Sequence, residues 1–323
     1  MGNLSNGILK ADIKSAAKLM RKIEEEDIKA IEELKLLYSH TGHSHVIGIT
    51  GLPGSGKSSL IDALIENFRS KNKTVGVIAV DPTSPFTGGS ILGDRIRMQN
   101  HSNDEGVFIK SLPTKGWRGG ISKVTSRMIT VMDAMGKDII LVETAGVGQT
   151  EVEIKKLVHT TIVVLVGGLG DSIQAIKAGI LEIADIFVIN KADKIDTEEL
   201  ETDIYNLLSM SSYTENNNSE KWLPQICLTE SVNRKGIDKL VREISIHENY
   251  LKSTGGFAQY FKYKSNNDLK EIIVDYLTNL IFKELENDEL YKKLLDDLMS
   301  NKNDPYSIAE EILNHFLKFK IKN

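Results

Sequence analysis

The sequence predicts an α/β fold, in which a mainly parallel, doubly wound sheet is flanked by N-terminal and C-terminal helical extensions. Two observations carry this prediction. Seven short apolar runs alternate with helical stretches between residues 46 and about 245, and each run is continuous, as expected for strands buried on both faces of a parallel sheet. The flanking segments instead repeat apolar residues every three or four positions, which is the spacing of a helix face. We therefore expect an N-terminal extension (1–45), an α/β domain (46–250) and a C-terminal helical arm (251–323).

Length and composition limit the class of protein. A chain of 323 residues has room for about two domains, and its 41% apolar and 26% charged residues are typical of a globular protein. The net charge of −5 predicts no overall basic surface for nucleic acid. Cys227 is the only cysteine, which excludes an intramolecular disulfide and a Cys-based zinc site. The sequence shows no membrane span and no targeting signal, so we expect a soluble, cytoplasmic protein.

The seven runs predict the strands of the sheet. They are VIGIT (46–50), TVGVIAVD (74–81), VFIKSL (107–112), DIILVET (138–144), TIVVLVG (161–167), DIFVIN (185–190) and QICLT (225–229). Because ligands of such folds bind beyond the carboxyl ends of the strands, the polar residues that follow each run are candidate site residues.

The two extensions read as helices. Residues 11–40 predict a helical hairpin with a solvated bend at the acidic cluster 24–27. Beyond residue 266 the sequence predicts a long helix, and Asp304 followed by Pro305 signals the start of the last one. The C-terminal helices carry more apolar surface than an appendage needs, which favours a dimerisation arm. The apolar positions are Ile13, Ala16, Ala17, Met20, Ile23, Ile28, Ile31 and Leu34 in the first segment and Leu269, Ile272, Ile273, Tyr276, Leu277, Leu280 and Ile281 in the last.

The strongest motif is a phosphate-binding loop at residues 51–59, directly after the first strand and at the start of a helix. Its glycines let backbone amides converge on phosphate oxygens, and the helix start adds positive potential. Lys57 would reach the outer phosphates and the Ser58 hydroxyl would bind Mg²⁺. The loop predicts a nucleoside triphosphate site. Its residues are Gly51, Leu52, Pro53, Gly54, Ser55, Gly56, Lys57, Ser58 and Ser59.

A second motif, NKAD at 190–193, predicts which nucleotide base is bound. Guanine presents two neighbouring donors, which one carboxylate can accept together, so Asp193 favours guanine over adenine. Asn190 would brace the loop, and the stem of Lys191 would cover the base. Ser231 and Val232 follow the last strand and are placed to complete the base pocket through a backbone amide. These residues predict that the nucleotide is GTP or GDP.

Acidic residues at two further strand ends complete the candidate site. Glu143 ends the fourth run and can hold Mg²⁺, while Gly146 can donate its amide to the γ-phosphate. Asp81 ends the second run, and the glycine-rich segment 81–98 adds Asp94 and Arg97, which suit metal and phosphate. Such a segment can switch between GTP and GDP states. No residue reads as a strong base for the attacking water, so we expect slow intrinsic hydrolysis that a partner accelerates.

Taken together, these segments resemble the G proteins associated with methylmalonyl-CoA mutase, a family earlier described as lysine/arginine/ornithine transport ATPases. The resemblance spans residues 10–315. It rests on GLPGSGKSSL, VDPTSPFTGGSILGDRIRM, ETAGVGQTE, GLGDSIQAIKAGILEIADIFVINKAD and DPYSIAEEIL. It departs from the family at residues 166–167, where a proline-containing turn is usual, and at residues 229–232, where a Ser-Ala pair is usual.

The resemblance implies a Mg²⁺-dependent GTPase, usually a homodimer, that chaperones an adenosylcobalamin-dependent acyl-CoA mutase. Such proteins gate cofactor loading and protect or reactivate the mutase. The resemblance also implies that Asp81, Asp94 and Glu143 surround Mg²⁺. In addition, residues 168–177, with Gln174 and Lys177, would respond to the mutase.

Three alternatives stay open. His40, His43 and His45 lie close together in sequence before the phosphate loop, and imidazoles can bind metal, so a nickel- or zinc-delivering GTPase is one. A kinase acting on a small molecule or a transport protein is the second, although no acceptor pocket is specified. A membrane-linked or RNA-linked GTPase is the third, and it lacks the amphipathic or basic surface that it would need.

Overall fold

The computed structural model describes residues 3–81, 101, 103–113, 120–144, 153–167, 181–194, 196–212, 222–285 and 288–321. Compact packing divides the chain into two units, Met1–Lys264 and Ser265–Asn323.

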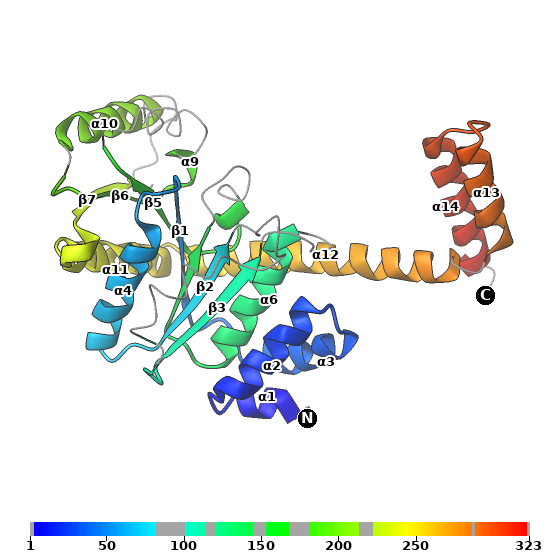
Figure 1. The fold of residues 1–323 in the computed structure, drawn as a ribbon, viewed down its shortest axis with the longest axis horizontal. Helices are drawn as coiled ribbons and strands as arrows, with labels where there is room; N and C mark the ends of the chain where they lie inside the picture. The colour runs from blue at the N-terminus through cyan, green and yellow to red at the C-terminus, as the bar shows by residue number, and fades with distance from the viewer. Residues whose placement is uncertain are drawn as a thin grey trace. The chain divides into compact units, whose positions relative to one another are not determined.

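The first unit is built on a seven-stranded parallel sheet with the order β3-β2-β4-β1-β5-β6-β7 (Figure 1). All seven predicted strands are present, and the mainly parallel α/β fold is confirmed. Each strand is a run of β-branched and other apolar residues with few exposed positions, as burial on both faces requires. The strands are β1 (His45–Gly51), β2 (Val75–Asp81), β3 (Val107–Pro113), β4 (Ile139–Glu143), β5 (Thr160–Leu165), β6 (Ile186–Asn190) and β7 (Gln225–Thr229).

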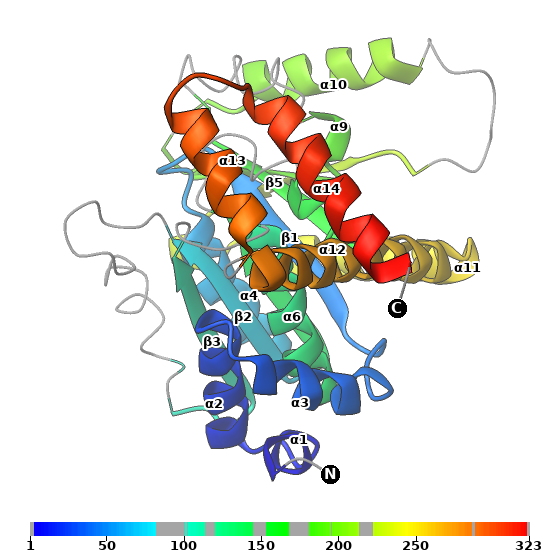
Figure 2. The ribbon, with the colours of Figure 1, turned by 90° about the vertical axis from the view of Figure 1, so that its right-hand side faces the viewer.

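Helices cover both faces of this sheet. One face packs against α4 (Lys57–Ser70) and α11 (Ile237–Ser253) through alternate strand residues such as Ile47 and Ile162. The other face packs against α6 (Gly120–Ala134) and the N-terminal helices, and against α9 (Leu181–Ile183) and α10 (Glu198–Ser212). The views in Figures 1 and 2 show this layering. Parallel pairing then brings the carboxyl ends of all strands to one edge, where the polar motifs lie.

The N-terminal extension contains the predicted hairpin and one further helix. Helices α2 (Ile13–Glu24) and α3 (Ile28–Tyr38) meet at the acidic bend, where Asp27 caps α3 by accepting from Lys29 N. Helix α1 (Asn3–Ile8) was not predicted, since its few residues show no helical periodicity. The predicted face of α3 was partly wrong: Ile28 is 78% exposed, because the helix turns Ala30 and Leu37 inward instead.

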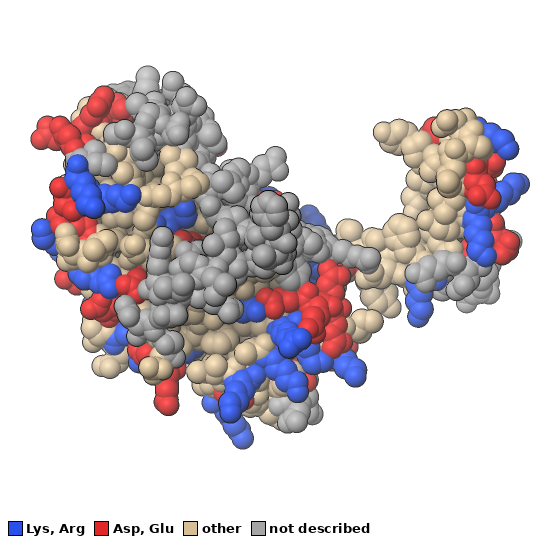
Figure 3. Space-filling model, viewed as in Figure 1, with Lys and Arg blue, Asp and Glu red and all other residues tan. Residues whose placement is uncertain are grey.

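Charges of both signs lie beside one another over the N-terminal helices (Figure 3). Arg21 pairs with Glu25 and Lys22 pairs with Asp27.

Among the helices that the structure describes, none has the length and apolar character that a bilayer span requires.

The second unit is helical. Helix α12 (Gly256–Leu285) enters it and is followed by α13 (Glu289–Met299) and α14 (Pro305–Ile321). Helices α13 and α14 pack side by side (Figure 2). The predicted start of the last helix is confirmed, because Asp304 accepts hydrogen bonds from the amides of Tyr306 and Ser307.

A buried histidine cluster lies at the amino ends of β1 and β5. His45 Nε2 is 2.7 Å from Thr160 Oγ1, which is also 2.9 Å from His247 Nδ1. His159 Nδ1 accepts from Val46 N at 2.9 Å. Burial, reinforced by the neighbouring histidine charges, lowers the pKa of His45 and that of His159 to about 3 each. Both rings are therefore neutral in the folded protein at neutral pH.

We expect this cluster to make folding stability depend on pH. The unfolded chain binds protons at these histidines below the ordinary pKa of 6.5, whereas the folded chain does so only near pH 3. Stability is therefore complete above pH 6.5 and falls as the pH drops toward 3, by about 2 kcal/mol for each histidine at pH 5. Urea unfolding at pH 7 and pH 5 would measure the loss. Replacing one ring, as in His159→Phe, should remove that ring's contribution to the loss, about 2 kcal/mol at pH 5. Equal stabilities of the wild-type protein at the two pH values would contradict the expectation.

Candidate functional site: a guanine-nucleotide site at the carboxyl ends of the strands

The phosphate loop joins β1 to α4, and its backbone geometry requires glycine at both ends. Gly51 has φ = 142°, and a Cβ there would lie 2.1 Å from the carbonyl oxygen of Val164 in β5. Gly56, which precedes the first residue of α4, has φ = 89°, and a Cβ there would lie 2.4 Å from Asn190 Nδ2. The loop therefore touches its neighbours so closely that side chains at these positions would displace it.

The first two residues of α4 point their polar groups into this region. Lys57 is buried, and its ammonium donates to the carbonyls of Gly51 at 2.8 Å and Leu52 at 3.2 Å. The Ser58 hydroxyl donates to Glu143 Oε1 at 2.9 Å, which links α4 to the end of β4. The structure thus places the predicted lysine, serine and glutamate of the phosphate side together. The hydroxyl and the carboxylate provide the hard oxygen ligands that Mg²⁺ prefers.

A threonine pair fixes the same strand end. Thr144 N donates to Ile49 O at 3.1 Å, and Thr144 Oγ1 donates to Thr50 Oγ1 at 2.9 Å. Sequence reasoning missed both threonines, because two hydroxyls that meet only across paired strands leave no local pattern. Their contact holds the backbone beside Glu143 in register with the phosphate loop.

Asn190, at the end of β6, holds the two halves of the site together. Its Nδ2 donates to the carbonyl of Ser55 in the phosphate loop at 2.9 Å. Its Oδ1 accepts from Thr229 Oγ1 at 3.1 Å, from Ser231 Oγ at 2.7 Å and from Ser231 N at 3.3 Å. All of these groups are buried. The Asn190 amide therefore joins the phosphate loop after β1 to the end of β7. Sequence reasoning had missed Thr229 among its partners.

The remaining base-side residues lie close by. Lys191 has φ = 60°, and its ammonium donates to Gly54 O at 2.8 Å, so its stem extends toward the phosphate loop. The Asp193 side chain is exposed and makes no hydrogen bond or ion pair with the described part of the chain. Ser231 is buried, and Val232 is 82% exposed at the tip of the short helix η3 (Ser231–Asn233).

Several predicted positions lie outside the described residues. These are Asp94, Arg97 and Gly146, together with residues 168–177, which include Gln174 and Lys177. The backbone of Asp81 ends β2 beside β4, with Ala79 opposite Glu143 in the ladder. The single cysteine, Cys227, is buried in β7, and burial raises its pKa to about 11, so it is no nucleophile at neutral pH.

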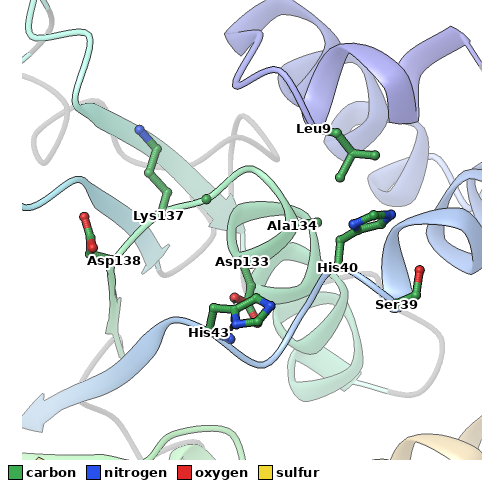
Figure 4. A pocket seen from close by; sticks show the side chains of 9 residues that line it. Leu9, Ser39, His40, His43, Asp133, Ala134, Lys137 and Asp138 are labelled. Atoms are coloured by element: carbon green, nitrogen blue, oxygen red, sulfur yellow. Dashed lines mark hydrogen bonds between the residues drawn. The ribbon is translucent and has the colours of Figure 1, made fainter.

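The three histidines before the phosphate loop do not form a cluster. His40 and His43 line a shallow pocket of about 560 Å³ near the amino ends of β1 and β4 (Figure 4). His45 is instead buried within β1. Asp133, which also lines the pocket, accepts from the amides of Gly42 and Ser44. No group of three or more His, Cys, Asp or Glu side chains that could hold a metal occurs among the described residues.

Comparison with known proteins establishes the family. The family model described as methylmalonyl Co-A mutase-associated GTPase MeaB matches residues 16–286, most of the chain. The chain belongs to the MeaB family. A Pyrococcus horikoshii relative named as a GTPase is 43% identical over 306 residues, which cover 94% of each chain. The Escherichia coli GTPase ArgK is 32% identical over 268 residues, covering 83% of this chain and 81% of that protein.

A solved structure agrees on the fold. The crystal structure of the LAO/AO transport system kinase has a TM-score of 0.66 and 23% identity, and the match covers 97% of this chain and 96% of that one. At that identity the likeness shows the fold alone. The family and the fold together make this MeaB-family protein a P-loop GTPase that binds guanine nucleotides and hydrolyses GTP.

We expect Asn190→Ala to weaken both stability and nucleotide binding. The change leaves the Ser55 carbonyl and the Thr229 and Ser231 hydroxyls without their partner, which costs about 1–3 kcal/mol. Urea unfolding and titration with a fluorescent GDP would measure the two losses. The matched control is Asn206→Ala on the exposed face of α10, which should change neither quantity by much. Unchanged GDP affinity in Asn190→Ala would contradict the role assigned to this side chain.

Proposed function

We propose that this MeaB-family GTPase is a nucleotide-dependent chaperone of an adenosylcobalamin-dependent acyl-CoA mutase, with methylmalonyl-CoA mutase as the first candidate. GTP binding and hydrolysis would gate the loading of the cofactor and protect or reactivate the mutase. The observation that carries the proposal is the match over residues 16–286 to a family described by its association with that mutase. A mouse relative, 32% identical over 66% of this chain and 51% of its own length, is named methylmalonic aciduria type A homolog.

The described residues divide the work of binding GTP. The loop from Gly51 to Ser59 would cradle the phosphates, with Lys57 moving from the loop carbonyls to the phosphate oxygens. Asp193, whose carboxylate is exposed, would accept from guanine. Ser231, whose own amide donates to Asn190 Oδ1, would position the neighbouring Val232 amide on the other side of the base.

The phosphate side of the site fits Mg²⁺. Ser58 Oγ and Glu143 Oε1 lie 2.9 Å apart at the helix start and the strand end, and Asp81 and Asp94 would complete the oxygen ligands by similarity to the family. Bound Mg²⁺ would neutralise charge on the β- and γ-phosphates. Because the Glu143 carboxylate accepts from Ser58 on the metal side, we do not assign it as the base for the attacking water. Slow intrinsic turnover that rises on contact with the mutase is the expected behaviour of such a switch.

The test is GTP hydrolysis by the purified protein, alone and with purified methylmalonyl-CoA mutase. We expect the mutase to raise turnover about tenfold or more, since an arginine or ordered loop that completes a GTPase site has effects of at least this size. Lys57→Ala and removal of Mg²⁺ should abolish the activity. The matched control is Lys71→Ala at the exposed C-terminal end of the same helix, which should keep it. Equal turnover with and without the mutase would refute the partner while leaving the GTPase assignment intact.

A homodimer is the second part of the proposal. Within the second unit, α12 exposes a row of large apolar side chains, among them Leu269 (55% exposed), Ile272 (54%) and Tyr276 (71%). Exposed apolar rows of this kind mark interaction surfaces. A second copy of the chain would cover them, as the resemblance to a usually homodimeric family suggests.

Light scattering at micromolar concentration would test the dimer. We expect about twice the chain mass of 35.9 kDa, because burying the apolar row stabilises association. Ile272→Asp should shift the protein toward monomer, whereas Lys270→Ala on the same helix should not. A monomeric wild-type protein would contradict this part of the proposal.

A further inference from the structure

The loop that follows β7 is held in one conformation by its own backbone. Glu230 and Lys235 form an antiparallel bridge, with Glu230 N donating to Lys235 O at 3.1 Å. Arg234 has φ = 59°. Gly236 has φ = 76°, and a Cβ there would lie 2.1 Å from Leu228 O. This tight turn, residues 230–236, presents η3 and is named the base loop below.

Arg234 attaches the base loop to the helix that begins at the phosphate loop. Its Nη2 donates to Asp62 Oδ2 at 2.5 Å and its Nε donates to Glu66 Oε2 at 2.6 Å, one turn apart on α4. Its Nη1 donates back to the carbonyl of Ser231 at 3.1 Å. Three donors of one rigid guanidinium are thus engaged in three directions, a task that suits arginine rather than lysine.

The other half of Ser231 is held by Asn190. Ser231 Oγ and N both donate to Asn190 Oδ1, and Asn190 Nδ2 donates to Ser55 O. A closed ring of contacts therefore runs from the phosphate loop through Asn190 and Ser231 to Arg234, and back along α4 to the phosphate loop. Helix α4 also packs directly against η3, so the two parts that this ring connects are neighbours in space.

The acidic partner of Arg234 is itself well placed. Asp62 is only 13% exposed, and its second oxygen, Oδ1, lies 3.0 Å from His101 Nε2. An exposed ion pair contributes little stability, and Arg234 is 38% exposed. The ion pairs of Arg234 therefore contribute little to the free energy of unfolding. Their main effect is to fix where the Ser231 backbone lies, because Arg234 also donates to the Ser231 carbonyl.

We propose that Arg234 is a positioning residue for guanine recognition, which holds the base loop at a fixed place relative to the phosphate loop without touching the nucleotide. The inference rests on the guanine pocket assigned to Asp193, Ser231 and Val232 above. If Arg234 is removed, Ser231 stays bound to Asn190 but loses its second support. The base side of the pocket loosens, while the phosphate side keeps Lys57 and Ser58.

The test compares guanine with adenine nucleotides. A ribose-labelled fluorescent GDP gives the affinity and the dissociation rate, and unlabelled GDP and ADP compete against it. We expect Arg234→Ala to weaken GDP binding and to speed its release, each about tenfold, the size of one lost charge-assisted contact. ADP binding should change less than twofold, so the preference for GDP falls by about the same tenfold. Arg234→Lys, which keeps the charge but not the fork, should be intermediate.

The matched control is Asp238→Asn. Asp238 lies in α11 and also links that helix to α4, because Asn67 Nδ2 donates to Asp238 Oδ1 at 2.6 Å. It lies outside the base loop. We expect this variant to behave as wild type. Equal losses for GDP and ADP, an unchanged rate of GDP release in Arg234→Ala, or the same loss in Asp238→Asn would each overturn the inference. A wild-type protein without preference for GDP would overturn the guanine pocket itself and the inference with it.

Discussion

The nucleotide site depends on the hydrogen bonds of one side-chain amide, that of Asn190. It is buried, and it joins the phosphate loop at Ser55 to the strand end and loop at Thr229 and Ser231. A buried amide cannot leave its partners without leaving polar groups unpaired, which costs more than the bonds themselves contribute. The phosphate and base halves of the site are therefore one unit, although 135 residues separate Asn190 from Ser55.

The parallel sheet explains why these groups meet. The order of the strands puts β1 between β4 and β5, with β6 and β7 following, so the loops after β1, β4, β6 and β7 all emerge at one edge. Ser58 reaches Glu143 because α4 starts beside the end of β4, and Lys191 reaches Gly54 because β6 ends near the phosphate loop. The amino ends of the strands carry the buried histidines and the pocket beside His40 and His43, away from the nucleotide site.

Membership of the MeaB family connects this geometry to a biological role. The described site binds and hydrolyses a guanine nucleotide with means common to P-loop GTPases, so the nucleotide chemistry alone does not select a client. The family description and the exposed apolar row of α12 are instead the basis of the proposed contacts with a mutase and with a second copy of the chain. The ion pair of Arg234 with Asp62 matters for how firmly the base loop is held against α4.

The sequence by itself determined the strands, the phosphate loop and the guanine motif, because each depends on residues that are neighbours in the chain. Continuous apolar runs identify buried strands, and Gly51, Gly56 and Lys57 act within one short turn. Only the tertiary structure showed that Thr50 meets Thr144, that Thr229 and Ser231 share Asn190, and that Arg234 spans two carboxylates of α4. It also showed which way α3 turns its apolar side chains and that His45 lies apart from His40 and His43. Such contacts join residues that are distant in the chain, and sequence spacing carries no record of them.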